Sequence, residues 1–465
     1  MGAVPGGIDT GRQPPMTVPL RHFLVALVLL VAGVTLGVGM RVGVAPGLAR
    51  LAHLHLLLAG WICVTIMGAM TQFVPVWSGV TLHSRRLADA QLALVVAGLI
   101  GFAGAFLLGR PTWTAPFGLL VLAGFWTFAY NVVRTLRPVE RYDVTERHFL
   151  VALAFLLVTT VLGVLLAIGF SGSVYPRMGV SRTGAVGAHA TVAVFGVVLT
   201  TVYGALYQLG TMFTQTELRG IDHRLRRIEE RGHPLGVVAL ATGRLVGNDP
   251  LARIGGILVV AAALAVCVVL ARKLYEMRVE PTPMHTRYAA FVVALALWSA
   301  VSLPAWATDP LSREHLLGAA GAGHLLVLGA IGFVVFGTLY HVVPFVVWVH
   351  RYSDLLGLED VPMIDDLYDD RLAAIDGSLL FAGTALIVAT DLLGSSGVAS
   401  ALGGVLVAAG VGAFALNVLS VLVRHGSRPI DRILLGGLSP RRAGGDSADP
   451  VDEQVTDPVD DPTHD

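Results

Sequence analysis

The sequence predicts an all-α polytopic membrane protein of about twelve transmembrane helices, arranged as three four-helix repeats with pseudo-threefold symmetry. Two observations favour this fold. The 465-residue chain is 55% hydrophobic and only 14% charged, with a mean hydropathy of +0.72. A soluble core could not bury so much apolar surface, so the composition is typical of a membrane protein. One apolar stretch also recurs three times along the chain.

Apolar segments of ~20 residues can cross a hydrocarbon layer of ~30 Å as helices. We expect such helices near residues 22–40, 50–77, 89–109, 115–135, 148–170, 186–213, 253–275, 287–307, 317–349, 372–393 and 400–423. The repeat requires a twelfth, and the weak span 232–248, which contains Arg244, is the candidate. Twelve spans place most of the 32 basic residues on one side, which the positive-inside rule makes the inner side. The sequence therefore predicts a multi-pass plasma-membrane protein with both termini inside.

The recurring stretch occupies residues 53–75, 187–211 and 322–344 and repeats one skeleton. Glycines follow His324 at +5 and +13, a polar residue follows at +17, and His55 starts the same pattern. The middle copy keeps both glycines, but its histidine, His189, lies in register with His53.

The starts of the units repeat as well, at Arg21, Arg147 and Arg287. A period of about 130 residues therefore divides a membrane domain at 21–425 into three units. These are residues 21–136, 147–276 and 287–423.

The two ends of the chain are expected to lie outside the bundle. Residues 1–20 are interpreted as a disordered inner N-terminus, and residues 426–465 as an acidic, disordered inner tail. Cys63 and Cys267 are expected to be packing residues without a disulfide. No phosphate-binding loop, nucleophile triad or nucleic-acid-binding pattern is evident.

Four histidines, His53, His55, His189 and His324, fall at one level near the outer ends of the second, sixth and tenth helices. A titratable side chain inside a membrane is costly, so it is a functional candidate, although a neutral histidine bonded to a carbonyl is the alternative. Imidazole binds iron and copper, and haem iron accepts axial side chains from facing helices. His55 is favoured as the partner of His324 because the two share a register, whereas His53 points about 200° away from His55.

This pattern of helices and histidines resembles subunit I of the haem-copper oxidases and the related NnrS family, which are haem- and copper-containing membrane proteins linked to nitric oxide metabolism. The resemblance covers roughly residues 20–425. It implies that a helix 2 histidine, His55 or His53, and His324 ligate a low-spin haem.

The chain departs from the oxidase pattern at three places. Ala322 replaces the second helix 10 histidine, residues 189–193 read HATVA and lack the oxidases' Glu and Tyr, and the weak span offers only His233 where the oxidases have a copper-binding histidine pair. The resemblance thus implies one bis-histidine haem site without a complete copper centre. His189 is left as a further haem or metal ligand.

The function implied by the resemblance is electron transfer or the handling of nitric oxide or another diatomic gas. The cofactor would be haem, expected to be b-type, with copper left open, and oxidoreductase activity of the oxidase type is also left open. The expected partners are the lipid bilayer and an electron donor or other respiratory subunits. The alternative is a non-redox transporter or assembly factor that kept the scaffold.

Overall fold

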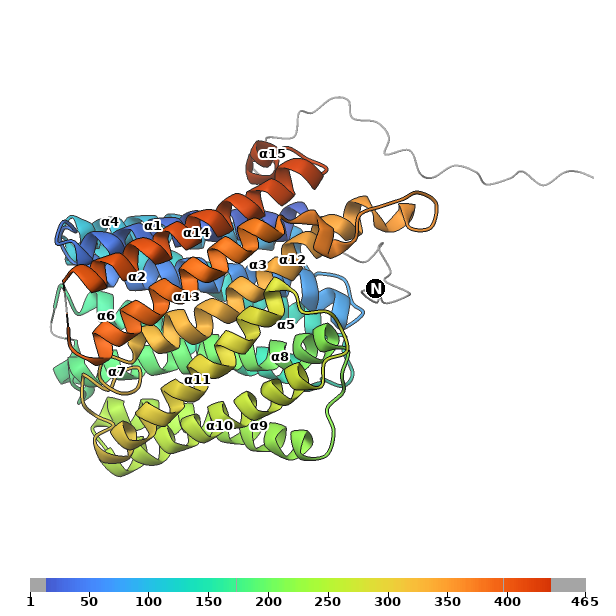
Figure 1. Ribbon diagram of the computed structural model, residues 1–465. Coiled ribbons are helices and arrows are strands. Elements are labelled where there is room, and N and C mark those ends of the chain that lie inside the picture. The colour runs from blue at the N-terminus through green and yellow to red at the C-terminus, as the bar shows by residue number, and fades with distance from the viewer. Residues whose placement is uncertain (1–13, 173, 396, 436–465) are drawn as a thin grey trace, which may run out of the picture.

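The computed structural model describes residues 14–435 except 173 and 396. Over this range the chain is a single bundle of long helices without a β-strand (Figure 1). Eleven helices in the described range are long and apolar enough to cross a membrane. The predicted all-α polytopic membrane fold is therefore confirmed.

The long helices fall into three consecutive groups of four. The first group contains α1 (Thr17–Arg41), a second helix made of α2 (Ala49–His55), η2 (Leu56–Ile62) and α3 (Cys63–Trp77), α4 (Arg85–Leu107) and α5 (Thr114–Leu136). The second contains α6 (Val144–Ile168), a helix made of α7 (Arg182–Thr191), η5 (Val192–Leu199) and α8 (Thr200–Thr214), α9 (Ile221–Val246) and α10 (Asp249–Tyr275). The third contains α11 (Pro283–Thr308), a helix made of η6 (Leu325–Gly332) and α12 (Phe333–Arg351), α13 (Asp370–Leu392) and α14 (Val398–His425). Short 3₁₀ turns occur at η3 (Pro111–Trp113), η4 (Tyr175–Met178), η7 (Ser353–Leu355) and η8 (Ile364–Leu367), and α15 (Ile430–Leu435) follows the last long helix.

The three groups make equivalent contacts and close into a ring. The third and fourth helices of each group pack as a hairpin, α4 on α5, α9 on α10 and α13 on α14. The fourth helix of each group packs on the first helix of the next, α5 on α6 and α10 on α11, and α14 returns to α1. Figure 1 shows α1 and α14 side by side at one edge of the bundle, with α9 and α10 at the opposite edge.

The recurring glycines mark where the first and second helices of each unit cross. Small residues allow membrane helices to approach closely. At +5, a Cβ would meet the neighbouring first helix at 3.1 Å for Gly60 against Leu29, 2.8 Å for Gly196 against Phe155 and 3.2 Å for Gly329 against Ala294. At +13, it would meet the first helix at 2.7 Å for Gly68 against His22, 2.4 Å for Gly204 against His148 and 3.1 Å for Gly337 against Arg287. The skeleton is therefore a helix-crossing motif.

The weak span 232–248 lies largely within α9, which begins earlier, at Ile221, and ends at Val246. The charged residues of its first turns keep α9 out of the eleven apolar helices. Its C-terminal half nevertheless packs backbone to backbone on α10, since a Cβ at Gly243 would lie 2.4 Å from the amide nitrogen of Ala252. The helix belongs to the bundle, and its crossing of the membrane stays a prediction.

The ends of the chain differ from expectation where they are described. Residues 426–435, expected to be part of a disordered tail, include the helix α15, whose Ile433 is fully buried. The Nε of Arg21 donates to the Ile433 carbonyl at 2.8 Å, which ties this helix to α1. The helix α1 starts at Thr17, before the expected boundary at residue 21. The remainder of both ends, 1–13 and 436–465, lies outside the described residues.

Each unit also contains an ion pair that the sequence did not reveal. The arginine near the start of the first helix binds an acid of the third helix, in the pairs Arg21 with Asp89, Arg147 with Glu230, and Arg287 with Asp376. The third pair is the most enclosed, because the side chain of Arg287 is 2% exposed and that of Asp376 is not exposed. It holds α11 against α13.

We predict that Asp376→Ala lowers the free energy of unfolding by about 3–5 kcal/mol, because it leaves the Arg287 guanidinium buried without its counter-ion. Thermal or denaturant unfolding in detergent measures the change. The control is Glu217→Ala, which removes an exposed partner of Arg219 and should cost less than about 1 kcal/mol. Equal effects of the two substitutions would contradict a stabilising role for the buried pair.

Candidate functional site

The four candidate histidines lie within three residues of the start of a π-helical segment. His55 precedes η2 and His324 precedes η6, while Thr191, at the corresponding repeat position, precedes η5 and follows His189 by two residues. Single-turn π-segments inside α-helices are rare and are frequent at functional sites. The three second helices therefore share an unusual backbone as well as a sequence pattern.

Three of the histidines are oriented by backbone carbonyls. The Nδ1 atom lies 2.8 Å from the Gly33 carbonyl oxygen in His53 and 2.8 Å from the Leu51 carbonyl oxygen in His55. In His189 it lies 3.0 Å from the Thr159 carbonyl oxygen. A carbonyl can only accept, so Nδ1 carries the hydrogen in each ring and Nε2 keeps a lone pair.

The fourth, His324, is oriented by a carboxylate. Its Nδ1 lies 2.5 Å from Oδ2 of Asp391, and the other oxygen of Asp391 lies 3.4 Å from the guanidinium of Arg41. Arg41 also donates to Ser400. A histidine whose Nδ1–H is bound to a carboxylate is the usual arrangement of a metal-ligating imidazole, because the carboxylate fixes the ring and raises its basicity.

A glycine with left-handed backbone makes this contact possible. Gly321 has φ of +76° and lies against the end of α13, where a Cβ would be 2.4 Å from the Asp391 carbonyl oxygen. Only glycine tolerates both conditions. Regular helix consequently begins at residue 323, later than the expected 317.

All four Nε2 atoms are free to bind a ligand. None has a hydrogen-bond partner among residues 14–435 other than 173 and 396, and none is among the fully buried polar atoms without a partner. Each of the four residues is half-buried. By contrast, Nε2 of His233 is bound to the Phe195 carbonyl at 2.9 Å, so that ring is engaged by the protein.

The neighbours of the helix 2 histidines differ from those favoured by register. His324 interacts electrostatically with His53, whereas the ring of His55 lies beside that of His189. Shared register fixes the height of a residue on its helix but not the neighbour it faces. The structure therefore places His55 beside His189, and the choice between His53 and His55 as the partner of His324 stays a prediction.

The surroundings of the two helix 2 histidines explain this division. His53 faces α1, where its ring covers Gly37. His55 faces α4, with its ring centroid 4.9 Å from that of Phe102 and 5.9 Å from that of Phe106. The two rings thus point to opposite sides of one helix, as residues two apart must.

No ready-made site for a bare metal ion accompanies these pairs. Within the described part of the chain, no group of three or more His, Cys, Asp or Glu side chains is placed to hold an ion. A metal that brings its own ligands, as haem iron does, needs only two axial side chains. The donor set of His53 and His324, with free Nε2 atoms and oriented rings, fits such a group.

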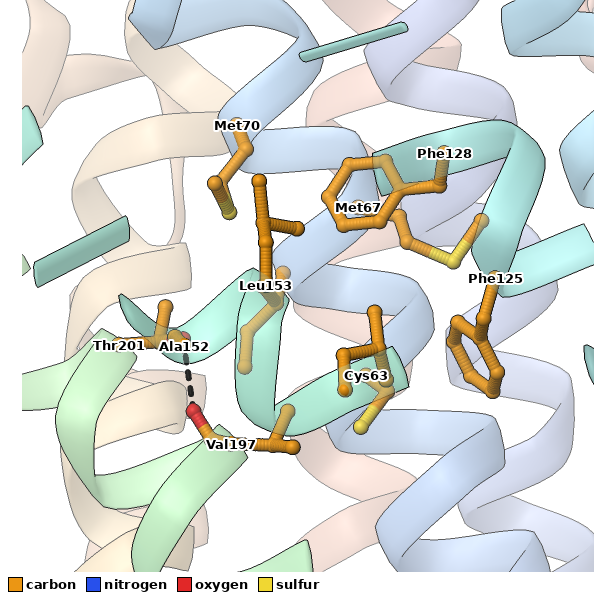
Figure 2. A pocket seen from close by; sticks show the side chains of 11 residues that line it. Cys63, Met67, Met70, Phe125, Phe128, Ala152, Leu153, Val197 and Thr201 are labelled. Atoms are coloured by element: carbon orange, nitrogen blue, oxygen red, sulfur yellow. Dashed lines mark hydrogen bonds between the residues drawn. The ribbon is translucent and has the colours of Figure 1, made fainter. Parts of the chain in front are cut away.

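Farther along the second helix, an apolar pocket lies between α3, α5, α6 and the helix of η5 and α8. Figure 2 shows Cys63, Met67, Phe125 and Leu153 around it, with Thr201 turned to donate to the Val197 carbonyl. Its lining offers no charged group. The pocket therefore suits an apolar occupant or packing, and Cys63 has no thiolate partner there.

The fold has a counterpart among solved structures. A chain from the cryo-EM structure of a haem-copper terminal oxidase dimer superposes with a TM-score of 0.66 at 15% sequence identity, covering 89% of this chain and 84% of that chain. No protein-family model matches the sequence, and no curated protein matches it. The likeness shows that the chain has a fold like that of a chain of this oxidase, in agreement with its eleven membrane-length apolar helices in the described range.

Proposed function

We propose that the protein binds haem and transfers electrons within the membrane, with His53 and His324 as the axial ligands of one iron. The observation that carries the proposal is that His53 and His324, from different units, lie within electrostatic range of each other and both have Nδ1 bound and Nε2 unbound among the described residues. The haem-copper oxidase neighbour makes haem a plausible occupant of this fold. The haem would be b-type, and the proposal includes no copper.

Haem, when bound, would supply a one-electron couple. The residues of the chain would hold and tune it. His53 and His324 would supply the axial nitrogens, Gly33 and Asp391 would keep Nδ1 protonated and the rings fixed, and Arg41 would partly compensate the charge of Asp391. Two protein ligands leave no open coordination position, so this arrangement favours electron transfer over gas binding.

Nitric oxide or another diatomic gas is the second candidate for the activity, suggested by the resemblance of the sequence pattern to that of the NnrS family. With haem bound, gas handling would require His53 or His324 to give up its bond to the iron. Adding nitric oxide to the reduced protein tests it, since an unchanged visible spectrum would exclude the gas-handling function.

We further propose a plasma-membrane location with the histidine level toward the outside and both termini inside. The distribution of basic residues supports this orientation. An electron donor or respiratory partner would then approach from the outer side. In intact cells, an impermeant maleimide should label Ser395→Cys, beside the α13–α14 turn, and spare Glu359→Cys, after α12, until the membrane is opened. The reverse pattern would invert the orientation.

The ligand assignment predicts that His324→Ala abolishes the low-spin absorption of this site while the protein still elutes as a monodisperse species. The visible spectrum of the reduced, purified protein measures it. The control is His341→Ala, because His341 packs on Phe213 farther along the same helix and should leave the spectrum intact. A colourless wild-type protein, or an unchanged spectrum of His324→Ala, would contradict the proposal.

We also predict that Asp391→Asn makes the reduction potential of the haem more positive, because it removes a negative charge that favours the oxidised iron. Loss of the orienting carboxylate should also weaken haem retention by roughly 10–100-fold. A redox titration followed by absorbance gives the potential. Glu359→Gln, which removes a charge at the other end of the bundle, should leave it unchanged.

A further inference from the structure

His55 and His189 form a second imidazole pair, and the site proposed above does not use it. Their ring centroids lie 6.5 Å apart with planes 23° from parallel. The two residues come from the second helices of the first and second units. Both Nδ1 atoms face backbone carbonyls, so both Nε2 atoms keep their lone pairs.

The internal repeat relates this pair to the first one. His189 corresponds in sequence to His53, and His55 corresponds to His324. Each pair therefore combines one residue at the repeat position of His53 and His189 with one at the repeat position of His55 and His324. The two members of a pair come from neighbouring units of the ring. The same geometric rule produces both pairs.

The contacts of the equivalent histidines agree with this relation. His53 binds the carbonyl of Gly33 and covers Gly37, where a Cβ would lie 2.7 Å from its ring. His189 binds the carbonyl of Thr159 and covers Gly163, where a Cβ would lie 3.2 Å away. In each case the carbonyl and the glycine are four residues apart on the first helix of the unit.

The third combination that the repeat allows contains no histidine and is filled by other side chains. It would join Ala322 to Thr191, and both residues are fully buried. The hydroxyl of Thr191 accepts a hydrogen bond of 2.7 Å from Arg244, whose guanidinium also binds the carbonyls of Pro310, His315 and Leu316. Unbound Nε2 atoms thus occur in the two combinations that contain histidines, His53 with His324 and His55 with His189.

We propose that His55 and His189 are the axial ligands of a second haem iron. With metal–nitrogen bonds of about 2 Å, two imidazoles on opposite sides of one metal have centroids about 6 Å apart, close to the observed 6.5 Å. A bare ion would need further ligands, and no third metal-binding side chain joins the pair in the described residues. Phe102 and Phe106 give His55 the apolar, aromatic surroundings that suit a porphyrin.

The identity of the bound group rests on the function proposed above, whereas the existence of a second site does not. Because His53 and His55 point to opposite sides of one helix, the two irons would flank that helix at the same level. The chain would then carry two electrons, one on each side of its second helix.

Counting haem tests the second site. The wild-type protein, purified from a haem-replete host, should contain two haems per chain by the pyridine haemochrome assay. His189→Ala should lose one haem or convert it to a high-spin form that binds carbon monoxide, which halves the low-spin signal. His324→Ala should halve the low-spin signal independently, and the variant that combines His189→Ala with His324→Ala should abolish it. The control His341→Ala should leave the signal intact. Free imidazole added to His189→Gly should restore the lost half.

The outcomes separate the two proposals. One haem per chain that is lost in His324→Ala and unaffected in His189→Ala would overturn the second site and leave the proposed function standing. Haem lost only in His189→Ala would support the second site and overturn the assignment of the first. A haem-free wild-type protein would overturn both assignments.

Discussion

The close crossing of the first two helices in each unit governs where every other group lies. The glycines at +5 and +13 bring the second helix onto the first, and no other residue could stand at Gly204, where a Cβ would lie 2.4 Å from the Cβ of His148. Such a contact fixes both the height and the rotation of the second helix. The carbonyls of Gly33 and Thr159 on the first helices can then meet histidine Nδ1 atoms on the second.

Several charged side chains buried in this bundle are bound by other side chains, because the bilayer core provides no water to bind them. Asp376 binds Arg287 and also accepts from Tyr340, and Glu229 is bound by His148 and Tyr207. In the four candidate ligands, only one of the two ring nitrogens is hydrogen-bonded to a described residue. Their Nδ1 atoms are bound, and their Nε2 atoms are neither bound within the described range nor fully buried. By contrast, Nε2 of His22 is fully buried without a partner in the described part of the chain, and Nε2 of His233 is bound to the Phe195 carbonyl.

The sequence could predict the parts of the structure that depend on periodicity. Helix lengths, the threefold repetition and the shared level of the four histidines follow from spacing alone, and the described residues confirm the all-helical membrane fold. The pairing of the histidines could not be predicted, because facing depends on the packing of helices from different units. Asp391 and Arg41 were missed for the same reason: they are 350 residues apart and meet only at the ring closure. The available signal was Asp391 itself, an acidic residue that follows the apolar stretch 379–390 of α13.

In each second helix, a π-helical segment separates the candidate histidine or its repeat equivalent from the second glycine at which the helix crosses its neighbour. Each residue added to or removed from a helix turns the portion beyond it by about 100°. The length of a π-segment therefore sets the direction in which the preceding histidine points relative to the second crossing glycine. A one-residue insertion or deletion between the histidine and the second crossing glycine would turn an imidazole toward a different neighbour while leaving the crossing at that second glycine in place. Such a change would reassign a candidate ligand to a different interface between units of the same scaffold.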